Sequence, residues 1–216
     1  MNVTLVRVTE NPVNAIEQAA SNCYDSTPTK SGAIMKSCYK SGHHSVLEFC
    51  NFHFHIEGVS RALLAQLTRH RMASYAVRSQ RYVREDGFGF VIPDTIKKDQ
   101  FSSVLYRAAM DKIKSAYDGL IKSGIPPEDA RYILPNACET VVDVSMNLRE
   151  LIHFMNERLC TRAQWEIRRM ATGMKNVVTE QYPEFADMLV PKCEVHGFCP
   201  EEKTCGRHPR LNDLVG

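Results

Sequence analysis

Apolar and polar positions alternate with a period of two in three parts of the chain, which predicts three strands. These parts are residues 2–9, 52–57 and 140–146. A fourth short apolar run, at 88–93, is closed by Pro93 and predicts a short strand. The strands are few and far apart, so they predict a small sheet.

Helical spacing of apolar residues covers much of the remaining chain. It predicts helices over 12–24, 29–41, 60–69 and 99–123, a helix that follows Asn147 to about residue 159, and a helix over 161–181. Asn147 is the expected N-cap, with Glu150 in the capping-box position. In the longest helix one apolar stripe is formed by Phe101, Val104, Leu105, Ala108, Ala109, Ile113, Ala116, Leu120 and Ile121.

Long helices with a few interspersed strands indicate an α+β fold. The composition changes only near Pro191, so we expect a main domain over 1–190 and a Cys/His-rich tail over 191–216. The chain has no Gly-x-Gly-x-x-Gly fingerprint, because Gly87 and Gly89 lack a third glycine. A Walker loop and a nucleophile elbow are also absent from the sequence, so a nucleotide would be bound on another architecture.

The composition is that of a globular domain, with 44% hydrophobic and 24% charged residues in 216. Every ten-residue window contains a charged residue, which excludes a membrane-spanning helix. The N-terminus lacks the pattern of a signal peptide. Five cysteines are scattered among core-like segments, so we expect reduced, buried thiols in a cytoplasmic protein. They are Cys23, Cys38, Cys50, Cys138 and Cys160.

The segment 66–82 concentrates the charge that could bind a ligand. Arg69, Arg71, Arg78 and Arg81 fall within thirteen residues, and the first acid after them is Glu85. Guanidinium groups so close together repel one another unless an anion neutralises them, and arginine suits phosphate and carbonyl groups. The segment therefore indicates a site for a phosphorylated small molecule. The alternative is a solvated basic face, although interspersed apolar residues indicate partial burial.

Four ordered elements of the chain resemble the flavin-dependent thymidylate synthase family. Arg69-His70-Arg71, followed after seven residues by Ser79, is similar to the family signature. The segment 42–48 resembles the element that precedes it, and 129–135 resembles a second arginine element. The C-terminal half resembles the family at Asn147, Arg149, His153, Arg158 and 163–167.

This resemblance implies a specific activity and fold. The family converts dUMP to dTMP, with methylenetetrahydrofolate as the carbon donor, NADPH as the reductant and FAD as the hydride relay. It implies a homotetramer whose active sites combine residues of several subunits. It also implies the family's own α+β fold, with a small, mostly antiparallel sheet rather than a Rossmann fold.

The resemblance also implies which residues bind each ligand. The flavin contacts would be Ser45, Glu48, Arg69, His70, Arg71, Asn147, Arg149 and His153. The nucleotide contacts would be Gln66, Arg69, Ser79, Gln80, Arg81, Arg131 and Arg158. Two positions depart from the pattern. Val77 stands where many members carry a Glu or Gln that touches the nucleotide, and Arg162 stands where some carry a His near the flavin adenine.

Arg158 is the expected catalytic residue. No cysteine lies in a recognisable nucleophile motif, so carbon 5 of uracil would be activated electrostatically by an arginine beside the ring. Arg149 and Arg158 are nine residues apart on one helix and therefore point about half a turn out of phase, so they should serve different ligands. Ser79 has no readable base partner and is assigned to the nucleotide phosphate. For His43, a proton shuttle and a plain loop residue remain open.

The tail contains five potential metal ligands, Cys193, His196, Cys199, Cys205 and His208. They could form a tetrahedral zinc site, although the spacing is not that of a standard finger. A disulfide and a simple exposed tail are the alternatives, and the expected chemistry requires no metal. A different function for the chain would be a nucleic-acid-binding module that uses the arginine cluster and a zinc-knuckle-like tail. A net charge of +2 and 8% aromatic residues argue against that function.

Overall fold

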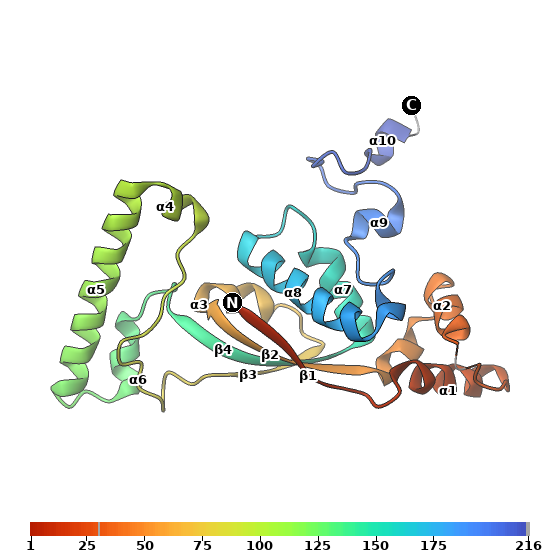
Figure 1. The fold of residues 1–216 in the computed structure, drawn as a ribbon, viewed down its shortest axis with the longest axis horizontal. Helices are drawn as coiled ribbons and strands as arrows, with labels where there is room; N and C mark the ends of the chain where they lie inside the picture. The colour runs from red at the N-terminus through yellow and green to blue at the C-terminus, as the bar shows by residue number, and fades with distance from the viewer. Residues whose placement is uncertain (30, 215–216) are drawn as a thin grey trace. The chain divides into compact units, whose positions relative to one another are not determined.

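The computed structural model describes residues 1–29 and 31–214 and divides them into two compact units. Unit 1 contains residues 1–2, 56–69 and 76–143. Unit 2 contains residues 3–55, 70–75 and 144 onward. Figure 1 labels the helices and strands of both units, and each unit is described by itself below.

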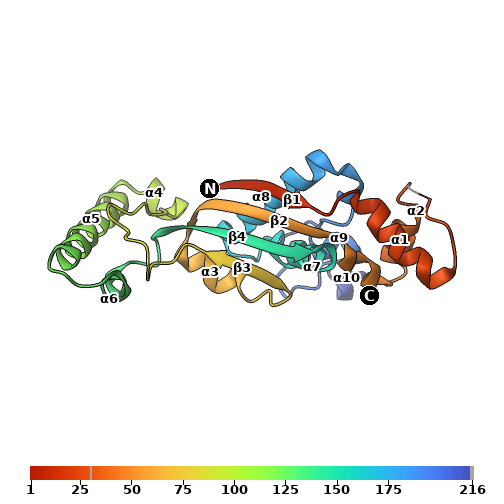
Figure 2. The ribbon, with the colours of Figure 1, turned by 90° about the horizontal axis from the view of Figure 1, so that it is seen from below.

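The strands form a four-stranded antiparallel sheet in the order β1-β2-β4-β3. Figure 2 shows the four strands side by side in this order. The predicted α+β class with a small sheet is confirmed. At one end of the sheet, Thr9 N donates to Asn51 O over 3.0 Å, and Leu148 N donates to Cys50 O over 2.7 Å. The strands are β1 (Asn2–Val8), β2 (Asn51–Ser60), β3 (Ala73–Val77) and β4 (Glu139–Asn147).

Three of the four predicted strands are confirmed as β1, β2 and β4. Phe52, Phe54 and Ile56 of β2 are buried, as the alternation indicates. The predicted strand over 88–93 is wrong, because this segment forms only an isolated bridge between Phe90 and Cys138. Strand β3 was not predicted, because it lies in the arginine-rich segment.

Unit 2 carries most of the helices, and α7 and α8 lie side by side in Figure 1. Helix α8 packs closely on β1, since a Cβ atom at Gly173 would lie 3.0 Å from Val3 Cγ2. Phe52, Phe154 and Phe185 are fully buried in this unit. Its helices are α1 (Pro12–Tyr24), α2 (Ala33–Lys40), η1 (His44–Phe49), α7 (Leu148–Arg158), α8 (Trp165–Gln181), η3 (Pro183–Phe185), α9 (Lys192–His196) and α10 (Leu211–Leu214).

Unit 1 is built around the long helix α5. The helix buries Met110 and Tyr117, whereas Phe101, Val104 and Leu105 of the predicted stripe are 78%, 63% and 62% exposed. The stripe is present, but this part of it is not covered within the chain. The helices of the unit are α3 (Arg61–Leu67), α4 (Asp94–Lys98), α5 (Gln100–Lys122), α6 (Pro127–Ala130) and η2 (Arg131–Ile133).

Two predicted helices begin later than expected, because local capping decides where they start. The helix predicted over 29–41 begins at Ala33, after Gly32 in the left-handed region at φ 76°. The helix predicted over 161–181 begins at Trp165. Its N-cap is Gln164, whose side chain accepts from Glu166 N at 2.9 Å and Ile167 N at 3.2 Å.

The cysteines are only partly as expected. Cys38, Cys50 and Cys138 are buried, but Cys23 is exposed and Cys160 is half-buried, so those two core assignments are wrong. Burial raises the pKa of the Cys50 thiol to about 12, which keeps it protonated. Among the described residues, no helix is both long enough and apolar enough to cross a membrane.

Candidate active site

The junction of β4 and α7 positions one group of polar side chains in unit 2. Asn147 ends β4 and caps α7, with its Oδ1 accepting from Glu150 N at 2.9 Å, so the predicted N-cap is confirmed. The first turns of α7 then line a hollow of about 530 Å³. Four predicted flavin contacts line this hollow, namely Glu48, Asn147, Arg149 and His153.

An ion pair stands in this hollow. Arg149 Nη1 donates to Glu48 Oε1 over 2.6 Å and joins α7 to η1. Both side chains are about half exposed, so water screens the pair and its contribution to stability is small. His153 lies one helical turn after Arg149 and is exposed. The hollow therefore presents a guanidinium, an imidazole and an amide that a ligand can reach.

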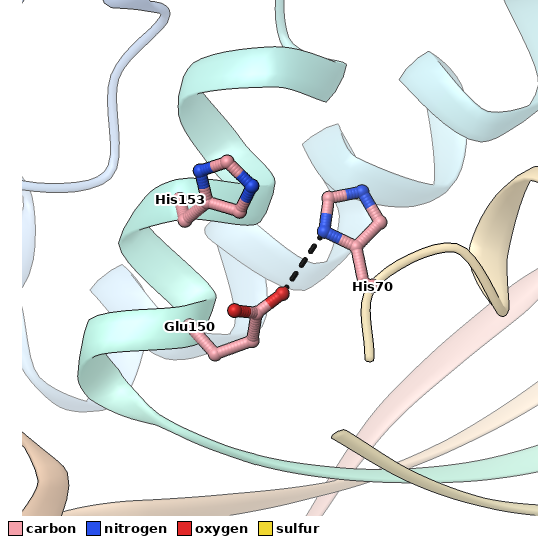
Figure 3. Close-up of side chains that lie close together, drawn as sticks. All are labelled: His70, Glu150 and His153. Atoms are coloured by element: carbon pink, nitrogen blue, oxygen red, sulfur yellow. Dashed lines mark hydrogen bonds and ion pairs between the residues drawn. The ribbon is translucent and has the colours of Figure 1, made fainter. Parts of the chain in front are cut away.

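His70 connects two polar residues beneath this surface. Its Nδ1 lies 3.0 Å from Glu150 Oε1, and Arg158 Nε donates to its Nε2 over 3.0 Å. Figure 3 shows His70 and His153 beside Glu150, with the His70–Glu150 contact dashed. Tyr75 also donates from its hydroxyl to the His70 carbonyl over 2.6 Å. The signature histidine is thus held from both sides and through its backbone.

The partners of His70 define its tautomer. Arginine only donates hydrogen bonds, so Nε2 must be the acceptor and the proton must be on Nδ1, which then donates to Glu150. Burial lowers the pKa of His70, and the nearby Arg158 charge lowers it further, while the hydrogen bond to Glu150 opposes this shift. His70 is therefore a neutral imidazole at neutral pH, and it fixes the direction of Arg158 Nε.

Unit 1 brings together a second group of predicted residues. Arg81 Nε donates to Glu128 Oε2 over 2.7 Å, and Arg131 Nε donates to the Glu128 carbonyl over 3.0 Å. Ser79 Oγ accepts from Arg81 N at 3.2 Å, which shapes the turn that presents this arginine. Glu128 therefore brings Arg81 and Arg131 together, and Ser79 contacts the backbone of Arg81. All three are predicted nucleotide contacts.

The other predicted contacts lie outside these two groups. Arg69 and Arg71 are exposed at either side of the buried His70, and Arg69 Nε donates to Ala65 O over 3.3 Å. Gln80 is buried, with its amide 3.6 Å from Cys138 Sγ. Gln66 is half-buried on α3, and Ser45 is exposed on η1. Their roles toward a ligand stay predictions.

Two acidic residues at these clusters were missed as site residues. Glu150 was interpreted only as a capping residue, although its position three residues before His153 places both on one face of α7. The signal for Glu128 is only its place one residue before the second arginine element. His44, Met72, Ile152 and Asn156 also line the hollow of unit 2. Met72 is 71% exposed, which corrects the expected partial burial there.

The family model described as "Thymidylate synthase complementing protein" matches residues 4–184. A flavin-dependent thymidylate synthase of Geobacter sulfurreducens is 42% identical, over 99% of this chain and 97% of its own length. One from Pyrococcus furiosus is 40% identical, over 93% of this chain and 90% of its own. The chain belongs to the flavin-dependent thymidylate synthase family.

The fold is also that of a solved member. A flavin-dependent thymidylate synthase from Helicobacter pylori, whose structure is described as complexed with FAD and dUMP, superposes with a TM-score of 0.73. The match covers 88% of this chain and all of the other at 23% identity, so it establishes the fold alone. The expected non-Rossmann α+β architecture agrees with this likeness.

Proposed function

We propose that this chain converts dUMP to dTMP, with methylenetetrahydrofolate giving the carbon, NADPH the reducing equivalents and FAD the hydride relay. The observation that carries the proposal is the contact between His70 and Arg158. It joins the family signature to an arginine 88 residues away in the sequence and orients that arginine. Near-full-length identity of about 40% to synthases supports the same activity. The nucleic-acid alternative has no such support.

The hollow of unit 2 fits part of a flavin nucleotide by its donor set. Arg149 and the N-terminus of α7 suit a pyrophosphate, since both favour an anion. Asn147 and His153 add directional donors for ring or ribose oxygens. When bound, FAD supplies the hydride relay. The proposed flavin contact set is completed by Ser45, Glu48, Arg69, His70 and Arg71.

The cluster of unit 1 supports binding of the nucleotide phosphate. Arg81 and Arg131 supply guanidinium forks, and Ser79 supplies a hydroxyl. Glu128 holds Arg81 through an ion pair. The nucleotide phosphate would replace Glu128 as the partner of Arg81. Gln66, Gln80 and Arg69 complete the proposed nucleotide contacts.

Arg158 is proposed to act on the uracil ring. Its guanidinium stabilises negative charge that develops on the ring carbonyl as carbon 5 becomes nucleophilic. Because arginine stays protonated at any useful pH, it acts as a fixed charge and not as a base. The His70 acceptor holds this charge in one orientation, so little reorganisation is needed during the reaction.

We also propose that the chain acts as a homotetramer with shared sites. Most predicted nucleotide contacts belong to unit 1 and most flavin contacts to unit 2. The exposed apolar residues of α5 provide a surface that a second copy could cover. The assignment of 1–190 as the catalytic domain and the cytoplasmic location stay predictions.

The test is an assay of the purified full chain with FAD, NADPH, methylenetetrahydrofolate and radiolabelled dUMP. We expect flavin absorbance in the protein and labelled dTMP among the products. Arg149→Ala should release FAD with little effect on dUMP binding. Arg81→Ala should weaken dUMP binding about ten- to a hundredfold and retain FAD. A chain that binds no flavin and forms no dTMP contradicts the proposal.

A further inference from the structure

The tail after α8 contains a group of metal-ligating side chains that the proposed reaction does not use. Cys193, Glu194 and His208 place their ligand atoms within 4.8 Å of one another. Ligand atoms around a tetrahedral zinc ion lie about 3.5 Å apart, given bond lengths of about 2.0–2.3 Å. The group needs only a small closure to reach that geometry.

Further thiols line a hollow that shares Cys193 with this group, although Glu194 and His208 do not line it. Cys193, Cys199 and Cys205 line one hollow together with Cys160, which comes from the connection between α7 and α8. The hollow holds about 10 Å³, roughly the room that a single water occupies. A space of this size can hold a single ion.

The backbone brings the two halves of the tail together. Cys199 N donates to Pro209 O over 2.7 Å, and Cys199 pairs in a parallel bridge with Arg210. These contacts hold Cys199 next to His208. Thr204 Oγ1 donates to His208 O over 3.1 Å and accepts from Gly206 N at 3.1 Å, which closes a turn around Cys205.

The packing of the tail gives an independent reason for a metal. In residues 193–210, all of which the structure describes, the only buried side chains are those of Cys193 and Cys199. A segment with so few buried apolar groups has little hydrophobic stabilisation, and such segments commonly depend on a metal or a disulfide. The two cysteines are free thiols here.

We propose that the tail binds one zinc ion through Cys193, Cys199, Cys205 and His208. Three thiolates and one imidazole are a soft donor set that favours zinc over oxygen-preferring cations, and four protein ligands define a structural site. Glu194 acts as a positioning residue, because its Oε2 lies 3.2 Å from His208 Nε2. A carboxylate on one ring nitrogen orients the imidazole and makes the other nitrogen a better ligand.

The test measures metal in the full-length chain, purified without chelator after growth with added zinc. We expect about one zinc per chain when the metal is measured by inductively coupled plasma mass spectrometry. Cys193→Ser and His208→Ala should lose it, and Glu194→Gln should bind it about 10–100-fold more weakly. The matched controls Cys23→Ser, an exposed thiol of α1, and His196→Ala, the other imidazole of the tail, should keep the metal.

Two further measurements protect the test against variants that fail to fold. Replacement of zinc by Co²⁺ in the unaltered chain should give a thiolate-to-cobalt charge-transfer band. Chelation should expose the peptide bonds after Lys203 and Arg207 to trypsin, since metal binding and folding are coupled in such sites. Both readouts are independent of dTMP formation, so their failure is distinguishable from failure of the proposed activity.

Several results would overturn the proposal. They are negligible metal in the chain purified after growth with added zinc, a cobalt form without the charge-transfer band, and a tail that forms a disulfide in place of a metal site. Retention of zinc by Cys199→Ser with loss in Cys160→Ser would overturn the assignment of Cys199 and give its place to Cys160.

Discussion

Arg158, the proposed catalytic residue, is held in one orientation by its neighbours. Its Nε is directed by the neutral His70, which in turn donates to Glu150. Arg158→Ala removes the fixed charge, so we expect turnover at saturating dUMP to fall on the order of 10²–10³-fold. Arg158→Lys should restore only part of it, because an ammonium cannot reproduce the planar fork.

Steady-state kinetics with bound flavin checked by absorbance make this measurement. If Arg158→Ala raises only the apparent dUMP constant and leaves turnover intact, Arg158 is a binding residue. The proposed activation of the uracil would then be wrong.

The pH dependence follows from the state of His70. Its pKa lies below the ordinary 6.5, chiefly because of burial, so the neutral form persists to lower pH in the folded protein. As the pH falls below about 6.5, the His70 imidazole of the unfolded chain becomes protonated while that of the folded protein is still neutral. The unfolded state is stabilised by this proton, so the contribution of His70 to stability is lost as the pH falls through the folded pKa. Protonation of Nε2 also ends its acceptor role toward Arg158, so turnover should fall in the same direction.

Glu150→Gln tests this coupling. The Glu150 carboxylate raises the pKa of His70 through its hydrogen bond and its charge. A glutamine keeps an oxygen that can accept from Nδ1 but carries no charge, so the acid limb of the turnover profile should move to lower pH. The matched control is Glu157→Gln, which removes a charge from the same helix at a residue that pairs with Lys192. A limb that stays in place in Glu150→Gln, or moves to higher pH, contradicts the assigned role of the carboxylate.

At this scale, the sequence predicted residues whose signal is local. Asn147 was found as a cap because the capping pattern lies within four residues. The contact of Glu150 with His70 could not be found in this way, because it joins residues 80 apart and depends on how α7 packs. The same holds for the ion pair between Glu48 and Arg149.

At the scale of the element, β2 contains a change of register that its alternation pattern did not predict. Phe52, Phe54 and Ile56 are buried at even positions, but the next buried residue is Val59. Between them Gly58 has φ 65°, in the left-handed region. A left-handed glycine at the point where the buried positions shift from even to odd numbers indicates a β-bulge.

Gly58→Ala should therefore destabilise the protein. The left-handed conformation costs a residue with a Cβ atom about 1–2 kcal/mol, and that Cβ would lie 2.9 Å from Met1 N. We expect a lower midpoint in thermal unfolding followed by circular dichroism. Gly119→Ala is the matched control, since its Cβ would meet nothing within 4 Å, and it should not lower the midpoint. Equal midpoints for both variants would contradict the bulge.

Elements with strong periodicity were predicted well, and the others were not. Helix α1 agrees with its predicted range, and α5 differs by one residue at each end. Strand β3 was missed because its sequence, ASYAV, lies among arginines and becomes a strand only by pairing with β4. The late start of α2 follows from Gly32, which the apolar pattern does not register.

At the scale of the whole molecule, one apolar face of α5 is exposed in the single chain. Phe101, Val104, Leu105 and Ala108 follow the i, i+3, i+4, i+7 spacing of a helix-packing face, yet all four are exposed. The sequence predicted this stripe, but a stripe does not say whether its own chain or another copy covers it. Exposure of three large apolar side chains on one face favours another copy.

Leu105→Glu should therefore weaken assembly. A carboxylate buried in an apolar interface has no partner to offset the loss of water, so the proposed tetramer should dissociate to smaller species in sizing chromatography with light scattering. Because the proposed sites combine residues of several subunits, dTMP formation should be lost along with the tetramer. Arg107→Glu, an exposed position to the side of the apolar face, changes charge without entering the face and should leave assembly intact. A Leu105→Glu chain that remains tetrameric would show that α5 is not the interface, and a monomer with full activity would remove the shared site.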